Sequence, residues 1–458
     1  TPTVGEACLR SHAIYRRARG MYFSVGDQGH MKSMVYNWPR DEVDVIVVTD
    51  GSRILGLGDL GANGMQISIG KLALYVAGGG IKPTNVLPVI LDVGTNNEAL
   101  LKDPLYLGTR QYRLEHQEYF DFVDEFLTAV RYRWPHVLVQ FEDIRNEYAF
   151  PLLDKYRDQH LCFNDDIQST GCIALAGLLA ALKVQSREFS AIKNQIIVCV
   201  GAGSAGLGVC ETIVRCMMDE GLNRGDAYRR FYLIDDKGLL GTGRQNLSVL
   251  QSAYQRHDLP GGLQLEEVIR KAKPTVLLGL SGCGGLFKEP EIREMVKHCY
   301  RPIIFPLSNP TANSECTAEE IAKWTDGRAI FASGSPFSDV TMPDGAVFGT
   351  SQVNNVYNFP GLGLAVTSCR ISSITDEMFQ AAARRIAELA AVDRLSGGKL
   401  FPPIRDLRKV SLEVAVAVAQ VALEKDMVRN HAPKRSSIRQ FLKSEMWDPE
   451  YPIVVPTQ

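Results

Sequence analysis

The sequence lacks the features that would mark a nucleic-acid-binding or membrane-spanning protein. Its formal net charge is −2 over 458 residues, whereas nucleic-acid binders usually carry a basic excess. No apolar run approaches the roughly 20 residues that a membrane-spanning helix needs. Internal repeats and low-complexity tracts are absent as well. These absences predict an ordinary globular chain, long enough for two or three domains, with neither a nucleic-acid nor a membrane partner.

Paired cysteines are also missing. The ten cysteines are scattered and contain no C-x-x-C pair, and several lie in apolar runs typical of a protein core. This pattern argues against a disulfide framework or a zinc site and favours a reduced compartment. The chain opens with Thr1-Pro2-Thr3, without a methionine or a signal-like segment. We therefore expect a trimmed product of a cytoplasmic or mitochondrial protein, with any targeting peptide out of view.

Apolar, β-branched runs alternate with helical patterns along most of the chain. One series of strands is expected at residues 43–49, 86–92, 137–141 and 161–163, and a second at 195–200, 231–235, 275–280, 302–307 and 329–332. Between them the pattern predicts helices, among them 118–134, 168–184 and 204–220. Continuous apolar strands separated by helices are typical of parallel sheets covered on both faces, so the expected fold class is α/β.

The same pattern suggests where the chain divides into domains. Residues 1–165 contain the first strand series and residues 166–354 the second, so each stretch is expected to form a domain. Residues 355–430 read as mainly helical. Residues 431–458 are polar and dotted with proline, so we expect a C-terminal arm, which either packs on a neighbouring subunit or frays.

Two short acidic segments each follow an apolar run. They are Gln140-Phe141-Glu142-Asp143 and Phe163-Asn164-Asp165-Asp166. Adjacent carboxylates repel and are costly to desolvate, so a buried strand end needs a compensating charge there. Mg²⁺ or Mn²⁺ would supply it through oxygen ligands. Either segment alone is explained by a solvated turn, but the two together indicate a metal site.

A glycine-rich loop indicates a dinucleotide site. Gly201-Ala202-Gly203-Ser204-Ala205-Gly206 follows an expected strand and opens an expected helix, which is the context that the G-x-G-x-x-G motif requires. Its glycines permit a tight turn and close approach of a pyrophosphate to the helix N-terminus. Asp235 ends the next strand, farther along than the usual spacing of about 20 residues, so the crossover must be extended. Ser281 follows another strand and is expected to face the same crevice.

Taken together, these segments make the sequence resemble the malic enzymes, which oxidatively decarboxylate malate to pyruvate with NAD or NADP and a divalent cation. The resemblance implies that residues 166–354 form a doubly wound nicotinamide-binding domain, inserted into a parallel-sheet substrate and metal domain that consists of residues 1–165 and the returning helical residues 355–430. It also implies a homo-oligomer, either a dimer or a tetramer. The matching segments span nearly the whole chain in order: TPTVGEAC at Thr1, VVTDGSRILGLGDLG at Val47, GKLALY at Gly70, QFEDI at Gln140, FNDDIQ at Phe163, GAGSAG at Gly201, PLSNPT at Pro306, FASGSPF at Phe331 and NNVYNFPG at Asn354.

The resemblance assigns roles to residues at matching positions. Glu142, Asp143 and Asp166 match the metal ligands. Lys71 matches the general base, and Asp165 matches the carboxylate that contacts it. A lysine can accept the proton of the malate hydroxyl only when it is neutral, so we expect burial or a nearby cation to lower its pKa.

Other matching positions surround the substrate and the nicotinamide. Arg53 matches the arginine that grips a malate carboxylate, which a guanidinium does bidentately. Asn309, Asn354 and Asn355 match amides that contact substrate and cofactor. The family's proton-donating tyrosine lies immediately before TPTVG, so this sequence does not contain it and the role is not transferred to another tyrosine.

The choice between NADP and NAD depends on the loop after Asp235. That aspartate by itself favours a free ribose 2′-hydroxyl, hence NAD, and Asp236 would repel a 2′-phosphate if it points inward. Lys237 and Arg244 would bind a 2′-phosphate, and Lys237 falls where NADP-using relatives tend to carry lysine. We favour NADP over NAD. Two other functions stay open: a decarboxylase or malolactic relative without net redox turnover, and a catalytically impaired protein that binds dinucleotide and dicarboxylate.

Overall fold

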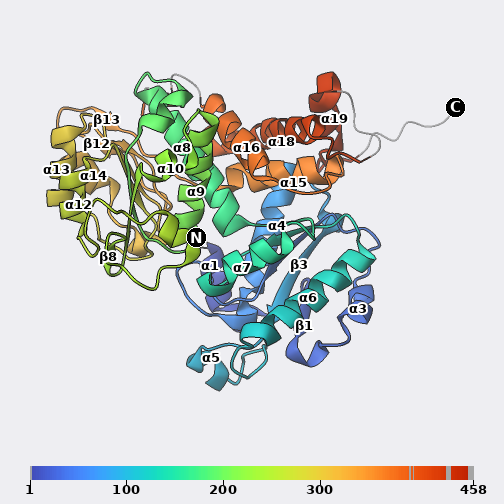
Figure 1. Cartoon of the computed structure of the whole chain (residues 1–458). Helices are drawn as coiled ribbons and strands as arrows, with labels where there is room; N and C mark the ends of the chain where they lie inside the picture. Colours follow the sequence, from blue (N-terminus) through green and yellow to red (C-terminus); the bar gives the residue numbers. More distant parts are fainter. Residues whose placement is uncertain (1–2, 391–393, 396, 430–434, 452–458) are drawn as a thin grey trace.

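The computed structural model describes residues 3–390, 394–395, 397–429 and 435–451. The described residues form two large sheets and one small hairpin, with the first large sheet in the lower part of Figure 1 and the second in the lobe on the left. The last helices, α15 to α19, return over the top of the first sheet. One sheet is fully parallel, the other is parallel except for one edge strand, and helices cover both. This arrangement confirms the expected α/β class.

The first sheet contains five strands in the order β1-β3-β2-β4-β5, all of them parallel. Its central strand β2 is buried along its whole length, as expected for a strand with helices on both faces. Four of the five strands were expected from the sequence. The strands are β1 (Met21–Ser24), β2 (Val45–Thr49), β3 (Val86–Asp92), β4 (Leu138–Phe141) and β5 (Cys162–Asn164).

Strand β1 was not expected from the sequence. It is only four residues long and lies at the edge of the sheet, where it pairs with β3 alone. Its residues alternate between buried and half-buried positions. A short edge strand carries too little apolar pattern to stand out from a loop, so its pairing with β3 is decided by tertiary contacts.

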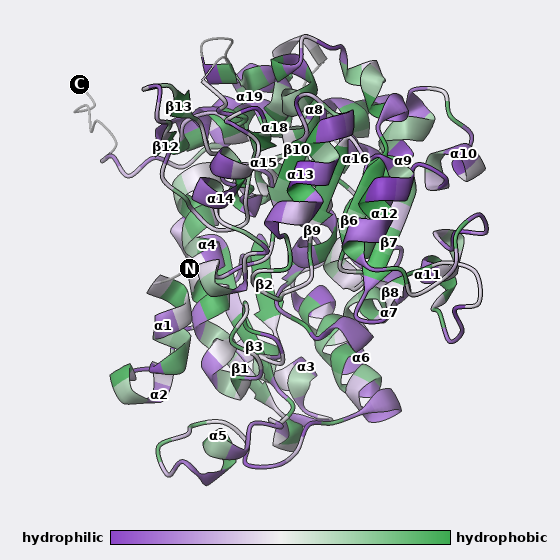
Figure 2. Ribbon diagram, turned by 90° about the vertical axis from the view of Figure 1, so that its left-hand side faces the viewer, coloured by the Kyte–Doolittle hydropathy of each residue, from purple (hydrophilic) through white to green (hydrophobic). Residues whose placement is uncertain are grey.

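The second sheet has six strands in the order β11-β10-β9-β6-β7-β8, and β8 alone runs antiparallel to its neighbour. This arrangement confirms the expected Rossmann-like, doubly wound sheet. In Figure 2 its strands β6, β9 and β10 are apolar and lie behind the more polar helices α12 and α13. The strands are β6 (Ile197–Val200), β7 (Phe231–Asp235), β8 (Gly238–Leu239), β9 (Val276–Gly279), β10 (Ile303–Pro306) and β11 (Ile330–Phe331), and a separate hairpin pairs β12 (Val340–Thr341) with β13 (Val347–Phe348).

Helices surround both sheets. The three helices expected at 118–134, 168–184 and 204–220 correspond to α6, α8 and α9. The α-helices are α1 (Thr3–Leu9), α2 (Ser11–Ile14), α3 (Met31–Met34), α4 (Met65–Gly79), α5 (Glu98–Lys102), α6 (His116–Arg133), α7 (Asn146–Tyr156), α8 (Thr170–Val184), α9 (Ser204–Asp219), α10 (Arg224–Tyr228), α11 (Val249–Ala253), α12 (Leu265–Ala272), α13 (Glu289–His298), α14 (Ala318–Trp324), α15 (Phe359–Ser368), α16 (Asp376–Leu389), α18 (Leu407–Glu424) and α19 (Ile438–Glu445).

Helix α8 continues a turn of π-helix over Asp165–Ser169 and forms the centre of the largest apolar core. The combined segment Asp165–Val184 is long and apolar enough to cross a membrane by length and composition, so the expectation that no run is long enough was wrong. However, 83% of its most apolar window is buried inside the protein. A helix that is apolar on all sides and covered by protein is a core helix.

The C-terminal stretch differs from the extended arm predicted for residues 431–458. Helix α19 lies within it and packs against α18 and α15, with Ile438 and Leu442 buried. These two residues are four positions apart and therefore share one helix face. Residues 430–434 and 452–458 lie outside the described residues, so the rest of the predicted arm stays a prediction.

Candidate active site

The two acidic segments meet at the carboxyl edge of the first sheet. Strands β4 and β5 are parallel neighbours, with Phe141 opposite Asn164. The residues that follow each strand therefore lie side by side. One carboxylate oxygen from each of Glu142, Asp143 and Asp166 lies within 4.8 Å of the others. The backbone N–H of Asp143 also donates to Asp166 Oδ2 at 2.8 Å.

The charge in this cluster is not balanced by its immediate neighbours. Burial and mutual repulsion raise the pKa of Glu142, Asp143 and Asp166 despite the nearby cations Lys71 and Arg53. Asp143 Oδ2 is buried without a hydrogen-bond partner. Converging oxygen ligands, raised pKa values and an orphaned oxygen together fit a hard divalent cation such as Mg²⁺ or Mn²⁺.

A buried hydrogen-bond chain, which the sequence did not reveal, supports Glu142. The Tyr75 hydroxyl donates to Gln140 Oε1, and Gln140 Nε2 donates to Glu142 Oε2 at 2.7 Å. Tyr75 and Gln140 are both fully buried. Tyr75 lies on α4, so this chain ties a helix of the first domain to the carboxylate cluster. Outer partners of this kind fix the orientation of a candidate metal ligand.

Lys71, also on α4, reaches the same cluster. Its Nζ lies 2.7 Å from Asp165 Oδ2 and 2.9 Å from Glu142 Oε1. Burial lowers the pKa of Lys71, but the charges of Asp165 and Glu142 outweigh it and leave the pKa raised. The expectation of a lowered pKa is therefore wrong for these residues by themselves, because two carboxylates stabilise the ammonium form.

The asparagines predicted at 354 and 355 are placed differently. Asn355 donates through Nδ2 to Asp165 Oδ2 at 2.9 Å and to Thr170 Oγ1 at 3.2 Å, so it orients the carboxylate that binds Lys71. Asn354 instead accepts from the backbone N–H of Val356 and caps its own short turn. Only Asn355 therefore contacts the acidic cluster directly.

Arg53 lies beside the acidic cluster and its side chain contacts the first residue of α7. Its backbone N–H donates to the carbonyl of Asp143, and its Nη1 donates to Asn146 Oδ1 at 2.7 Å. The backbone carbonyl of Asn146 accepts from Ser204 Oγ at 3.2 Å. Asn146, which the sequence did not single out, thus connects Arg53 with the glycine loop of the dinucleotide domain.

The glycine loop has the conformation that its sequence predicts. Gly201 has a φ of +118°, and a Cβ there would lie 2.3 Å from the carbonyl oxygen of Leu280. A Cβ on Gly206 would lie 1.9 Å from the carbonyl oxygen of Gly201. Both positions therefore require glycine. Gly203 is exposed and immediately precedes the first residue of α9. Its backbone therefore borders the helix N-terminus, where a phosphate is favoured.

Asp235 ends β7, as predicted, and the extra helix α10 accounts for its long spacing from the glycine loop. Arg244 pairs with both carboxylate oxygens, with Nη1 at 2.9 Å from Oδ1 and Nη2 at 2.5 Å from Oδ2. The expectation that Arg244 is available for a phosphate is therefore wrong in this arrangement, because the bidentate pair occupies its guanidinium. Asp236 and Lys237 are exposed in the same loop.

Ser281 and Asn309 follow neighbouring strands β9 and β10 and lie at the same edge of the second sheet. Ser281 borders the dinucleotide loop, since a Cβ on Gly201 would lie 2.8 Å from its backbone nitrogen. Asn309 is exposed, and its carbonyl oxygen would lie 2.8 Å from a Cβ on Gly56. Gly56 belongs to the first domain, so this contact brings the loop after β10 against the first domain.

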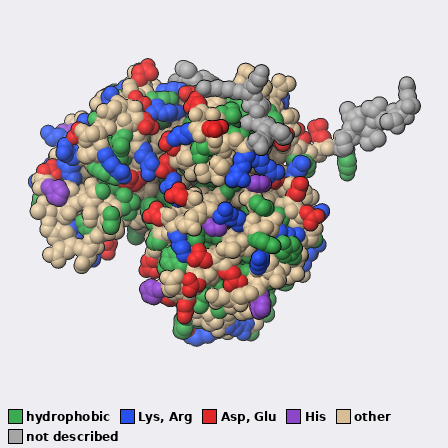
Figure 3. All heavy atoms as spheres, turned by 45° about the vertical axis from the view of Figure 1, so that its right-hand side comes forward, with side chains coloured by type: hydrophobic (Ala, Val, Ile, Leu, Met, Phe, Trp, Pro, Cys, Tyr) green, Lys and Arg blue, Asp and Glu red, His purple; other side chains and the backbone are tan. Residues whose placement is uncertain are grey.

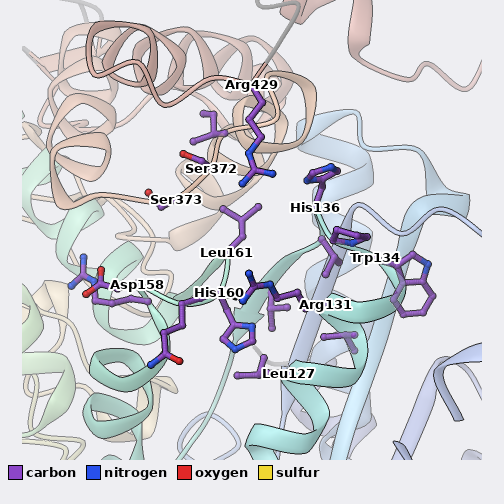
Figure 4. Close-up of a pocket in the computed structure, with 17 residues that line it drawn as sticks. Leu127, Arg131, Trp134, His136, Asp158, His160, Leu161, Ser372, Ser373 and Arg429 are labelled. Atoms are coloured by element: carbon purple, nitrogen blue, oxygen red, sulfur yellow. Dashed lines mark hydrogen bonds between the residues drawn. The ribbon is translucent and has the colours of Figure 1, made fainter. Parts of the chain in front are cut away.

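A separate cavity of about 90 Å³ lies at the opposite ends of the β4 and β5 strands. Figure 4 shows Arg131, His136, His160 and Arg429 around it. None of the residues predicted for the site lines this cavity. On the face shown in Figure 3, basic and acidic side chains are interspersed, in keeping with the small net charge.

Comparisons with known proteins agree with this geometry. Residues 1–157 match the family description "Malic enzyme, N-terminal domain", and residues 167–423 match "Malic enzyme, NAD binding domain". The chain is 52% identical to the hydrogenosomal malic enzyme of Neocallimastix frontalis, over 99% of this chain and 77% of that protein. It is 46% identical to the mitochondrial NAD-dependent malic enzyme of Solanum tuberosum, over 99% of this chain and 76% of that protein.

Further relatives include both cofactor types. The chain is 45% identical to the NADP-dependent malic enzyme of Homo sapiens, over 100% of this chain and 79% of that protein. Among solved structures, the malic enzyme of Entamoeba histolytica has the same fold, with a TM-score of 0.69 and 24% identity over 92% of this chain and 77% of that one. Because two family domains match and the relatives match along nearly the whole of this chain, the chain belongs to the malic enzyme family, whose members oxidatively decarboxylate malate with NAD or NADP.

Proposed function

We propose that this chain converts L-malate to pyruvate and CO₂ with reduction of NADP, using a divalent cation held by Glu142, Asp143 and Asp166. The observation that carries the proposal is the meeting of these carboxylates with Lys71 at the carboxyl edge of the first sheet. Family membership supports malate as the substrate and a nicotinamide cofactor as the oxidant.

The acidic cluster provides the metal site of this proposal. Three ligands from two loops leave coordination positions for substrate and water in an octahedral site. A bound Mg²⁺ or Mn²⁺ would polarise a substrate oxygen, and its charge would offset the carboxylates that raise the pKa of Lys71. Gln140 would keep Glu142 oriented through its 2.7 Å hydrogen bond.

Lys71 is the proposed general base. Its amine takes the proton of the malate C2 hydroxyl while hydride leaves C2, and nicotinamide supplies the hydride acceptor when bound. Asp165 accepts from Lys71 Nζ at 2.7 Å, and Asn355 holds the same carboxylate oxygen at 2.9 Å. This pair of contacts aims the amine, so Asp165 and Asn355 position the base relative to the substrate.

Arg53 is the proposed clamp for a malate carboxylate. It lies next to the acidic cluster and at the side of the glycine loop, between the two binding regions that the reaction must bring together. Binding of one carboxylate by the guanidinium fixes C2 for hydride transfer. Asn309 and Asn354 are proposed to contact substrate or nicotinamide from the second domain, a role for which the exposed position of Asn309 leaves room.

The dinucleotide is proposed to bind along Gly201, Ala202, Gly203, Ser204, Ala205 and Gly206, with Asp235, Asp236, Lys237 and Ser281 around its adenosine and nicotinamide ends. We favour NADP over NAD. Arg244 already neutralises Asp235, which weakens the repulsion of a 2′-phosphate, and Lys237 is exposed in the same loop. A lysine there would pair with the phosphate as a point charge.

The remaining assignments are also proposals. The domain limits of 1–165, 166–354, 355–430 and 431–458 are proposed from the sequence pattern and the resemblance. Only the boundary after 165 falls between the two family matches, which cover residues 1–157 and 167–423. A homo-oligomer, dimer or tetramer, is proposed from the family. A cytoplasmic or mitochondrial location is proposed alongside relatives whose names include mitochondrial and hydrogenosomal forms.

The activity is tested by following reduced cofactor and CO₂ together. Purified protein is mixed with L-malate, Mn²⁺ and either NADP or NAD, and we expect one reduced cofactor per CO₂ released. CO₂ release without reduced cofactor would instead indicate a malolactic or simple decarboxylating relative. Binding of dinucleotide with neither product would indicate a catalytically impaired binding protein.

A further inference from the structure

Glu315 is a fully buried carboxylate behind the cofactor edge of the second sheet. Its Oε1 accepts from the Ser281 backbone N–H at 3.0 Å, the Ser281 hydroxyl at 2.7 Å and the Ser308 hydroxyl. Its Oε2 accepts from the Ser308 backbone N–H at 3.3 Å. Among the described residues, no lysine, arginine or histidine forms an ion pair with Glu315. Four donor groups thus converge on this side chain and give both of its carboxylate oxygens hydrogen-bond partners.

These hydrogen bonds join two loops that leave adjacent strands. Ser281 follows β9 and Ser308 follows β10, and the backbone N–H of Gly282 donates to Ser308 Oγ at 2.8 Å. The end of β9 makes room for the carboxylate, since a Cβ on Gly279 would lie 2.4 Å from Glu315 Cδ. The carboxylate therefore occupies a space that the sequence keeps open with a glycine.

One loop contacts the dinucleotide loop and the other contacts the first domain. The Ser281 backbone packs against Gly201 of the dinucleotide loop. The residues after Ser308 reach the first domain, where a Cβ on Gly56 would lie 2.5 Å from Pro310 Cδ and 2.8 Å from the Asn309 carbonyl oxygen. A displacement of Glu315 would therefore move the Ser281 loop and the Ser308 loop together.

We propose that Glu315 is a positioning residue. It fixes the position of the Ser281 loop relative to the Ser308 loop, which includes Asn309, so that hydride transfer can occur. The inference rests on the proposed function, because that function places dinucleotide at the first loop and malate at the second. Glu315 acts through Ser281 and Ser308. Small displacements of such loops are costly, because hydride transfer depends on the approach of the reacting atoms.

Glu315→Gln disturbs one side of this joint. The glutamine oxygen can keep the position of Oε1 and its hydrogen bonds to Ser281 and to the Ser308 hydroxyl, but the NH₂ group then faces the backbone N–H of Ser308 and pushes that loop away. We expect kcat to fall about tenfold or more and the KM for malate to rise. The dissociation constant of the dinucleotide, titrated without malate, should change by less than about threefold, because the Ser281 contacts survive.

Glu315→Ala removes both sets of contacts, so it should also weaken dinucleotide binding about tenfold. Ser308→Ala should reproduce the kinetic pattern of Glu315→Gln, and this variant carries the test if Glu315→Ala fails to fold. The matched control is Glu320→Gln, an exposed glutamate five residues away that caps α14 through Thr317, which should leave all these constants unchanged.

The inference is overturned if Glu315→Gln and Ser308→Ala keep kcat, the KM for malate and the dinucleotide dissociation constant within about twofold of wild type. It is also overturned if both variants change these constants only in proportion to a lowered unfolding temperature. Failure of the proposed function is distinguishable, because the wild type would then bind dinucleotide but not oxidise malate, and the dinucleotide titrations of Glu315→Ala would still report on the loop.

Discussion

The two sheets differ in how far the carboxylates at their carboxyl edges are balanced by neighbouring groups. At the first sheet, Glu142, Asp143 and Asp166 converge, and their pKa values are raised by burial and repulsion. At the second sheet, Asp235 is paired with Arg244, and Glu315 is satisfied by four donors. An edge whose charges are balanced by the protein is built to hold a shape, whereas an edge with excess charge is suited to receive a cation.

The largest expected effect comes from breaking the unbalanced edge. Asp166→Ala removes one of the three proposed metal ligands, so metal-dependent oxidation of malate should be abolished while dinucleotide binding survives. Turnover measured against Mn²⁺ concentration, together with a dinucleotide titration, checks this. Full activity with an unchanged metal affinity would show that Asp166 is not a ligand.

Removing the proposed base should have the next largest effect. Lys71→Ala should lower kcat by about 10²–10⁴-fold, the usual contribution of general acid–base catalysis, with a smaller change in malate affinity. A small primary amine in solution should restore part of the activity, because it can enter the space left by the side chain. Steady-state kinetics with and without the amine decide between this role and a purely structural one.

Removing the proposed clamp, Arg53, should weaken malate binding more than it lowers kcat. Arg53→Ala should weaken malate binding by about 1.5–3 kcal/mol, the loss expected for hydrogen bonds to a charged group. The dissociation constant of malate, or that of a non-reacting dicarboxylate, provides the measurement. If Arg53→Ala mainly lowers kcat and Lys71→Ala mainly weakens malate binding, the two roles have been exchanged.

The same substitution at the two edges should change stability in opposite directions. The carboxyl groups of the first edge have folded pKa values raised above 3.8 for aspartate and 4.5 for glutamate. Their contribution to stability is therefore fully present below these ordinary values and is lost as pH rises through the folded pKa. At neutral pH without metal, Asp166→Asn should stabilise the protein by about 1–3 kcal/mol, because it removes one repelling charge.

At the second edge, Asp235→Asn leaves Arg244 without its carboxylate and should destabilise the protein by about 1.5–3 kcal/mol. Denaturant unfolding of both variants at neutral pH and at pH 4, with chelator present, provides the comparison. The difference for Asp166→Asn should shrink at the lower pH, because the wild-type carboxyl groups carry less negative charge there than at neutral pH. Destabilisation by both substitutions would contradict the contrast between the two edges.

The smallest expected effect concerns cofactor choice. Lys237→Ala should lower kcat/KM for NADP by about three- to tenfold, as expected for a partly solvated charge pair, and leave NAD use nearly unchanged. Arg244→Lys serves as the matched variant, since it keeps a positive charge but loses the bidentate pair with Asp235. A wild type that prefers NAD, or a Lys237→Ala variant with unchanged NADP use, would contradict the proposed preference.

Much of the scaffold was predictable because strongly periodic segments carry their own signal. Strands β3 and β7 have the predicted limits, and α9 begins at the predicted Ser204. The edge strand β1 and helix α4 were not predicted. Strand β1 is too short to show a pattern, and α4 is apolar on nearly all sides and contains several glycines. Yet α4 carries Lys71 and Tyr75, so the element most important for the proposed base was recognised only through the family resemblance.

The partners of the site residues were the least predictable part. The sequence places Asp235 and Arg244 nine positions apart, but it does not show that they pair with each other rather than with a ribose and a phosphate. It does not show that Lys71 faces two carboxylates, which reverses the expected direction of its pKa shift. Hydrogen bonds and ion pairs between distant residues depend on side-chain direction, which periodicity does not encode.

The sequence by itself determined the alternation of apolar strands and helices, the glycine loop and the acidic strand ends, because each of these depends on residues that are close together in the chain. The tertiary structure alone decided that α4 delivers Lys71 to those carboxylates, that Asn146 bridges Arg53 to the glycine loop, and that Glu315 joins the Ser281 and Ser308 loops. The physical reason is that charge balance and hydrogen bonding act across space, so the state of a buried group depends on which distant segments the fold brings against it.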